Sequence, residues 1–167
     1  QAATDIKHAS LVNKEDPAIP GLKLELKTRR DLFRQAEKIK TELAQTRASA
    51  RKLALEKAKL NLKIGITAYY RGNYFEAYRI LKPLADQDIT RAQVRIATML
   101  LEGRGVPPSR ALATEWFLRA LTSVQLAAAR GEAWAQSDYG DYFADGIVMK
   151  QNFQQAVVWY RRSAQQG

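Results

Sequence analysis

The sequence predicts an all-α protein, in which a long charged helix precedes an α-solenoid of helix-turn-helix hairpins. Two observations support this fold class. Residues 91–121 and 134–164 align without a gap at an offset of 43 residues, and self-similarity at a fixed period is typical of repeat architectures. Residues 23–62 contain neither glycine nor proline and carry apolar side chains at helical spacing, which favours one long helix.

The two repeats share the residues that would set their packing. Trp116 aligns with Trp159, and a matched pair of tryptophans is hard to reconcile with chance. The other identical positions that we use pair Ala92 with Ala135, Gln93 with Gln136, Gly103 with Gly146 and Ala113 with Ala156.

Each repeat is predicted to contain two helices. The first should end at Gly103 or Gly146, because glycine readily takes the left-handed conformation that closes many helices. The second should begin after Ser109 or Asn152, whose side chains can accept a hydrogen bond from a free backbone N–H.

The repeats resemble the Sel1-like repeat, a relative of the tetratricopeptide repeat. Its pattern is roughly AxAQxxLGxxYxxGxGVxxDxxKAxxWxxKAAxxG and recurs about every 36 residues. The departures are Ala97 for the mid-helix glycine, Val148 and Met149 for glycine and valine, and Ser109 and Asn152 for the two aspartates. The resemblance implies an α/α repeat fold but no chemistry, because the matched residues are packing residues. They are Ala92, Gln93, Gly103, Gly105, Val106, Ala113, Trp116 and Ala120, and then Ala135, Gln136, Gly140, Gly146, Ala156, Trp159, Ala164 and Gly167.

The spacing of 43 leaves about seven residues more than this pattern needs. They fall near residues 122–128, where neither Gly nor Pro occurs. Seven residues are almost two helical turns, so a helix can lengthen and keep its faces in register. We therefore predict one long helix over 109–129 that overhangs its neighbours.

Residues 60–88 predict a further hairpin of the tetratricopeptide type. Asn73 stands four residues before Ala77, the same spacing that separates Ser109 and Asn152 from their alanines. Pro83 predicts a kink or a stop, and Asp88 replaces the closing glycine of the pattern, so that turn should differ. The predicted plan is an extended segment over 1–22, a long basic helix over 23–62 and a repeat domain over 63–167, with hairpins at about 60–88, 91–130 and 133–167.

The N-terminal third carries two separate expectations. Pro17, Pro20 and Gly21 argue against helix over 1–22. The long helix carries a thin apolar stripe that Lys57 interrupts, which suits either coiled-coil pairing or a cap lying along the first hairpin. We favour the cap. The stripe comprises Leu32, Ala36, Ile39, Leu43, Thr46, Ala50, Leu53 and Leu60.

The positive charge is concentrated near the N-terminus. Residues 1–63 hold 15 Lys or Arg against 8 Asp or Glu, out of a net charge of +10 for the chain. Such a helix could contact an acidic protein surface or an anionic membrane surface. Nucleic-acid binding also needs aromatic side chains for base stacking, and Phe33 is the only aromatic residue within 23–62.

Catalytic and metal-binding patterns are missing from the sequence. With one histidine, His8, and no cysteine, we expect neither a Ser–His–Asp nor a Cys–His arrangement, and disulfides are excluded. Asp138, Asp141 and Asp145 lie at helical spacing, but a metal site usually needs ligands from several directions. Because Asp138 aligns with Arg95, an ion pair between neighbouring helices is the better interpretation. We predict no enzyme activity, cofactor, metal or small-molecule substrate.

Once catalysis and metal binding are set aside, the remaining functional interpretation is a surface that binds other protein subunits. Solenoids present a concave face lined by the first helix of each repeat. At the end face, Phe153 and Val158 add apolar surface that the preceding repeat cannot cover alone, so residues beyond 167 or a partner subunit should cover it. The predicted concave binding residues are Tyr69, Tyr70, Arg91, Arg95, Thr98, Glu102, Asp138, Asp141, Tyr142 and Asp145.

The sequence therefore predicts a protein–protein scaffold or adaptor within a larger bacterial assembly, of the cell-envelope, motor or secretion type. The alternative is a nucleic-acid-associated repeat protein that uses the basic helix. We expect a periplasmic location, with the cytoplasm as the alternative, because many bacterial proteins resembling this family are exported. Gln1 is not an initiator methionine, so we expect a processed chain or a fragment. No run of 18 apolar residues is present.

Overall fold

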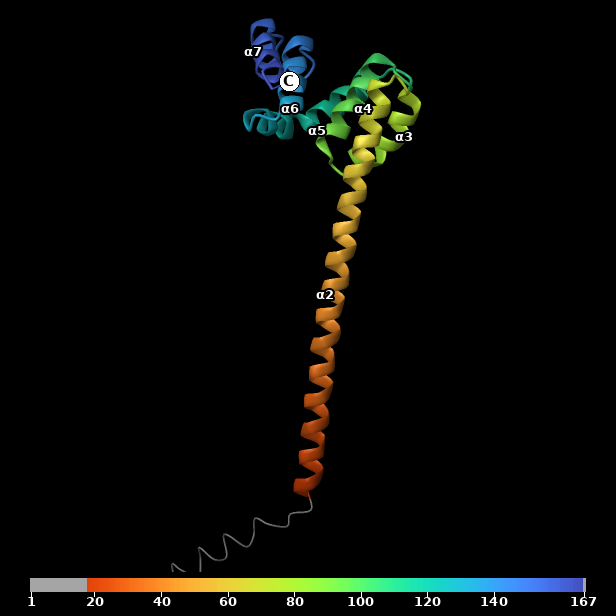
Figure 1. Ribbon diagram of the computed structural model, residues 1–167, viewed down its shortest axis with the longest axis vertical. Coiled ribbons are helices and arrows are strands. Elements are labelled where there is room, and N and C mark those ends of the chain that lie inside the picture. The colour runs from red at the N-terminus through yellow and green to blue at the C-terminus, as the bar shows by residue number, and fades with distance from the viewer. Residues whose placement is uncertain (1–17, 167) are drawn as a thin grey trace, which may run out of the picture. The chain divides into compact units, whose positions relative to one another are not determined.

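The computed structural model describes residues 18–166, and every regular element among them is an α-helix (Figure 1). The helices are α2 (Ala18–Tyr70), α3 (Tyr74–Ala85), α4 (Thr90–Glu102), α5 (Arg110–Ala129), α6 (Ala133–Asp145) and α7 (Phe153–Ala164). The chain divides into two compact units, Gln1–Leu53 and Ala54–Gly167. The all-α prediction with a long N-terminal helix is confirmed.

The long helix is longer than predicted at both ends. It begins at Ala18, so the predicted extended segment over 1–22 is wrong for residues 18–22, and residues 1–17 lie outside the described part of the chain. Pro20 is tolerated because it lies in the first helical turn, where backbone N–H groups have no intrahelical partner. At the other end α2 runs to Tyr70, so residues 54–70 themselves form the first helix of the first hairpin.

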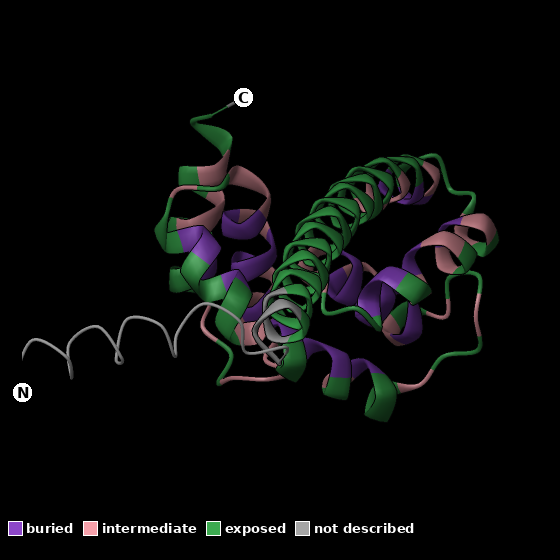
Figure 2. Ribbon diagram, turned by 90° about the horizontal axis from the view of Figure 1, so that it is seen from below, coloured by how far each residue is buried: buried purple, intermediate pink, exposed green. Residues whose placement is uncertain are grey.

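In the first unit, all described side chains of α2 are exposed. This holds for every residue from Leu24 to Leu53, including the part of the predicted apolar stripe from Leu32 to Leu53 (Figure 2). Within this unit Leu32 is 59% exposed and Leu53 72%. The cap along the first hairpin stays a prediction.

The second unit begins with the hairpin formed by residues 54–70 and α3. Gly65 permits close approach of the two helices, since a Cβ built there would lie 2.6 Å from Leu81 Cδ2. Asn73 occupies the predicted N-cap position, but its side chain makes no capping hydrogen bond; its carbonyl accepts from Ala77 N–H at 3.0 Å. Pro83 lies inside α3, which continues to Ala85.

In the next two hairpins, α4–α5 and α6–α7, the first helix ends and the second helix begins where the sequence predicts. Gly103 and Gly146 close α4 and α6 with φ of 70° and 62°, in the left-handed region. Ser109 Oγ accepts from Leu112 N–H at 3.4 Å, and Asn152 Oδ1 accepts from Gln155 N–H at 3.0 Å. Side-chain capping therefore starts α5 and α7.

The extra residues of the longer repeat do form helix, and α5 has 20 residues. The predicted overhang is wrong, however, because the extension is packed. Val124 is fully buried and Ala128 is 1% exposed. Gln125 Nε2 also donates to the hydroxyl of Tyr139 on α6, at 3.1 Å. The added turns of α5 thus enlarge the contact with the following hairpin.

The turns between hairpins are alike, although the sequence predicted otherwise. Asp88 has a φ of 60° and Gly131, its repeat equivalent, a φ of 89°. Aspartate is one of the few non-glycine residues that enter this region. In both repeats a buried glutamine ties one hairpin to the one before: Gln93 Nε2 donates to the carbonyl of Ala85 and Gln136 Nε2 to that of Ala128, each at 3.3 Å.

The core of the second unit lies between the stacked hairpins. Leu81, Ile96, Met99 and Val124 are its largest fully buried side chains. Trp116 is 8% exposed, as the repeat alignment predicted. Trp159 is only half-buried, which contradicts that prediction, because α6 covers one side of the indole and no described helix packs onto the other.

Candidate functional site

A cavity of about 260 Å³ opens between the first helices of the three hairpins. Eight of the ten residues predicted from the concave face line it: Tyr69 from α2, Arg95, Thr98 and Glu102 from α4, and Asp138, Asp141, Tyr142 and Asp145 from α6. Three further lining residues, Val94, Leu101 and Phe117, were not predicted and form an apolar part of the cavity wall. Their apolar character predicted burial rather than a cavity lining.

The other two predicted residues lie outside this cavity lining. The Tyr70 side chain is 69% exposed, although the Arg95 guanidinium lies 5.9 Å from its ring centroid. Arg91 instead places its guanidinium 5.2 Å from the ring centroid of Trp134. Both residues therefore border the site without enclosing it.

A buried ion pair joins the two walls of the cavity. Arg95 Nη2 donates to Asp138 Oδ1 across the repeat offset of 43 residues, as predicted, and the two side chains are 12% and 3% exposed. The Arg95 guanidinium also lies 5.4 Å from the ring centroid of Tyr69, a cation–π distance. Burial raises the pKa of Asp138, and Arg95 opposes that rise.

Two buried oxygen atoms at this cavity have no hydrogen-bond partner among the described residues. They are Asp138 Oδ2 and the Tyr142 hydroxyl, and Tyr142 is only 3% exposed. Burial raises the pKa of Tyr142, and the Asp138 carboxylate adds to the rise, so the phenol stays protonated. An unpaired buried polar group costs free energy, and a donor group entering the cavity would satisfy the carboxylate.

The rim of the cavity is acidic. Asp141 Oδ1 accepts a hydrogen bond of 2.7 Å from the hydroxyl of Tyr160, and Glu102 Oε2 lies 2.7 Å from Arg104 Nε. Although the Asp145 side chain is exposed, partial desolvation of its carboxyl group raises its pKa. Asp141 and Glu102 raise this pKa further, and Arg110 opposes them.

This arrangement suits a cationic group. The cavity lining holds four carboxylates, those of Glu102, Asp138, Asp141 and Asp145, and one guanidinium, that of Arg95. No cluster of His, Cys, Asp and Glu within residues 18–166 has the geometry to hold a metal ion. The lining thus carries more acidic than basic side chains.

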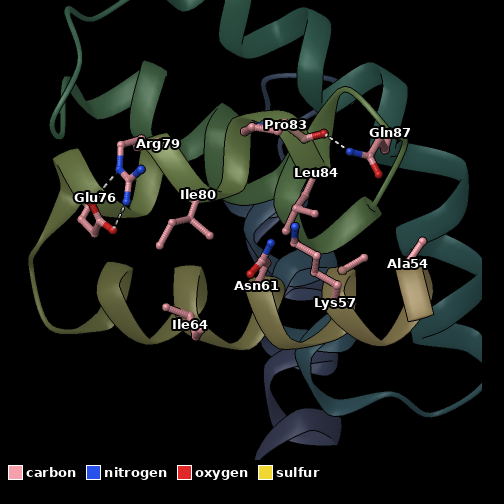
Figure 3. A pocket seen from close by; sticks show the side chains of 11 residues that line it. Ala54, Lys57, Asn61, Ile64, Glu76, Arg79, Ile80, Pro83, Leu84 and Gln87 are labelled. Carbon is pink, nitrogen blue, oxygen red and sulfur yellow. Dashed lines mark hydrogen bonds and ion pairs between the residues drawn. The ribbon is translucent and has the colours of Figure 1, made fainter. Parts of the chain in front are cut away.

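A larger groove of about 680 Å³ lies between residues 54–64 of α2 and α3 (Figure 3). Three of its polar side chains, those of Glu76, Arg79 and Gln87, already have partners within the chain. Arg79 holds both carboxylate oxygens of Glu76, at 2.9 and 2.7 Å, and Gln87 Nε2 donates to the carbonyl of Pro83 at 3.0 Å. These side chains therefore need no hydrogen-bond partner from another molecule, unlike Asp138 Oδ2 at the acidic cavity.

The predicted end-face residues lie on α7. Phe153 is 61% exposed, Val157 44% and Val158 40%. Their use as an interface stays a prediction. No helix within the described residues is both long enough and apolar enough to span a membrane.

Stacked helical hairpins with matched left-handed turns and a buried glutamine at each junction define an α/α repeat protein. Residues 90–122 and 135–167 match the Sel1 repeat. The chain thus contains two Sel1 repeats, and the predicted resemblance is confirmed.

Among solved structures, the chain is similar to one described as a Sel1 repeat protein from Oxalobacter formigenes. The two share 31% sequence identity over 64% of this chain, with a TM-score of 0.42. The chain spans 39% of the length of that protein. No curated protein matches the chain.

Proposed function

We propose that this protein is a non-enzymatic adaptor, and that its acidic cavity binds a basic side chain of a partner protein. Sel1 repeats generally mediate protein interactions. The single observation that supports this choice of partner is the buried, unpaired oxygen of Asp138 beside acidic rim residues.

The chemistry favours a cation presented by a protein. An attraction between opposite charges is several-fold stronger in a partly buried cavity than in bulk water. A cavity of about 260 Å³ suits one side chain and is small for most drug-sized ligands. A lysine ammonium has three donors and an arginine guanidinium five, enough to reach Asp138 Oδ2 and a rim carboxylate together.

The adaptor belongs, in this proposal, to a larger bacterial assembly of the cell envelope, motor or secretion type. We propose the periplasm as its compartment, because many bacterial proteins with this kind of repeat are exported. Fractionation of the native organism tests this part separately. Recovery of the protein with a cytoplasmic marker would overturn the compartment and leave the cavity proposal standing.

The function can be tested by affinity capture from the native organism, followed by binding measurements with the captured partner. Asp141→Asn/Asp145→Asn removes two rim charges and leaves the Arg95–Asp138 pair intact. We expect at least a tenfold loss of affinity, on the order of 1.4 kcal/mol. Glu115→Gln is the control, because Glu115 is exposed and lies outside the cavity lining. Unchanged affinity in the double variant would overturn the proposal.

The alternative function, nucleic-acid association, draws on the excess of basic residues over 1–63. It predicts binding that weakens steeply and linearly with the logarithm of salt concentration, because phosphate contacts release counterions. Binding of a mixed-sequence RNA or DNA duplex that survives Asp141→Asn/Asp145→Asn and shows that slope would favour this alternative.

A further inference from the structure

The exposed apolar residues of α2 follow the repeat of a coiled coil. From residue 32 to residue 53, seven positions alternate at intervals of four and three, giving three heptads. Large exposed side chains occupy four of them: Leu32 (59% exposed), Ile39 (63%), Leu43 (47%) and Leu53 (72%). We call this set the α2 seam; its d positions are Leu32, Ile39, Thr46 and Leu53 and its a positions are Ala36, Leu43 and Ala50.

A seam of this kind needs a cover. Soluble proteins rarely leave a large contiguous apolar patch facing water. A helix that makes no tertiary contact also loses the packing that supplies most helical stability. Every α2 side chain from Leu24 to Leu53 is exposed, so the described residues of this unit provide neither the cover nor the packing.

The flanking charges identify what covers the seam. At the e positions Phe33, Lys40 and Arg47 include two bases and no acid; at the g positions Gln35, Glu42 and Ser49 include one acid and no base. In a parallel pair each g residue faces the e residue five positions further along the other helix, so Glu42 meets Arg47 twice by symmetry. An antiparallel pair would oppose e to e and g to g, which places bases beside bases. Charges at e and g set partner and orientation in coiled coils, and this segregation favours a second copy in parallel.

Charges within one helix do not prevent this pairing. Lys38 Nζ lies 3.9 Å from Glu42 Oε1 and Lys40 Nζ lies 3.5 Å from Glu37 Oε1. These are exposed i,i+4 and i,i+3 pairs, which contribute little and can rearrange.

We propose that residues 32–53 form a parallel, in-register, two-stranded coiled coil with a second copy of this chain. The narrow a and d seam suits two strands, because broader apolar faces are needed in larger bundles. Alanine at two a positions and Thr46 at one d position limit the apolar area that each layer buries. The dimer is therefore one that dilution dissociates, and each dimer carries two acidic cavities.

Sedimentation equilibrium of the whole chain over a concentration series tests the proposal. We expect a monomer–dimer equilibrium, a dissociation constant raised at least 100-fold by Leu43→Glu, and little change from Leu55→Glu. Leu55 is the matched control, since it is 55% exposed on the same helix but occupies an f position, opposite the seam. A wild-type chain that stays monomeric throughout, or equal effects of the two variants, would overturn the proposal.

The orientation has its own test. Arg47→Glu should weaken the dimer at least tenfold by placing two glutamates beside each other, and adding Glu42→Arg should restore it. The chain has no cysteine, so Ile39→Cys should give one disulfide-linked dimer on mild oxidation, with its two d-position sulfurs adjacent. An antiparallel dimer would give no rescue and no crosslink, and would overturn the parallel arrangement. Association only with a different protein would overturn the choice of a second copy. Neither test involves the cavity, so failure here and failure of the proposed function are distinguishable.

Discussion

The guanidinium of Arg95 has a charged partner on α6 and aromatic rings on α2. Its side chain is 12% exposed, that of Asp138 is 3% exposed, and Tyr69 and Tyr70 lie within cation–π distance. A buried ion pair adds little over a well-packed apolar pair, but removing one partner strands the other charge away from water. Arg95 and Asp138 therefore specify how α4 and α6 are aligned more than they raise net stability.

A double-mutant cycle should show this coupling. We expect Asp138→Asn and Arg95→Met each to lower the free energy of unfolding by about 3–5 kcal/mol. The double variant should lose clearly less than the sum, because neither charge is then stranded. Urea unfolding followed by circular dichroism supplies the three values. Additive losses would mean that the pair is not an energetic unit.

The two repeat tryptophans should differ in their contributions, although the sequence treats them alike. Trp116 is 8% exposed, whereas Trp159 is half-buried and contacts Tyr139 at a centroid distance of 5.0 Å. Trp116→Ala should cost about 3–5 kcal/mol, as large-to-small aromatic core changes do, and Trp159→Ala should cost less. Thermal unfolding of the two variants side by side tests the order; equal losses would contradict the burial difference.

The raised pKa of Asp145 predicts a pH effect. Its folded pKa lies above the ordinary value of 3.8 because of burial, Asp141 and Glu102, with Arg110 opposing. In the window just above 3.8 the folded state then holds more of this proton than the unfolded state, so the Asp145 contribution falls as pH rises. The stability difference between Asp145→Asn and wild type should therefore shift in favour of the variant as the pH rises above 3.8. A difference that does not vary with pH would contradict the shift.

At the scale of the helix, Gly140 sets the spacing between α6 and α7. A Cβ at this position would lie 2.6 Å from Tyr160 Cε1, and the Tyr160 ring is held by its hydrogen bond to Asp141. The equivalent position in the preceding repeat is Ala97, which is fully buried. The glycine is thus specific to the hairpin that contains Tyr160.

Gly140→Ala should cost about 1–3 kcal/mol by overpacking. In a Tyr160→Ala background the same change should become neutral or stabilising by up to about 1 kcal/mol, because alanine is the better helix former. Denaturant unfolding of the four proteins tests this. If Gly140→Ala has the same effect in both backgrounds, Tyr160 does not impose the glycine.

Local signals predicted most helix ends, and tertiary packing decided the rest. Gly103, Gly146, Ser109 and Asn152 marked the ends of helices because each has a backbone or capping preference of its own. Residues 122–128 were predicted to be helical from the absence of Gly and Pro, but their burial depends on α6. The start of α2 was missed because Pro20 is a helix breaker only beyond the first turn.

The cavity could be predicted only in part for the same reason. The repeat offset paired Arg95 with Asp138 and placed the acidic positions of α6 on one face. It could not show that the Tyr142 hydroxyl would be buried without a hydrogen-bond partner among the described residues, or that Phe117 would line the cavity. Those features follow from the packing of α5 against its neighbours, and no single-helix pattern contains them.

At the scale of the whole molecule, two association surfaces of different kinds can be separated. The α2 seam is self-complementary, and such a surface produces a closed two-fold dimer. A dimer with two cavities gains avidity for a partner that presents two basic sites, provided both can be reached at once. The α7 face, with Phe153, Val157 and Val158 exposed, has no charge pattern that defines its cover.

The end face should therefore behave independently of the seam. In a Leu43→Glu background, where the seam no longer pairs, we expect residual self-association and binding of a hydrophobic dye. Phe153→Ser/Val158→Ser should reduce both without lowering the helical content, because these side chains are 61% and 40% exposed and leave no large cavity. Leu118→Ser, at an exposed position of α5 (53%), is the control for a general loss of apolar surface. A Leu43→Glu chain that is monomeric and binds no dye would show that α7 needs no cover.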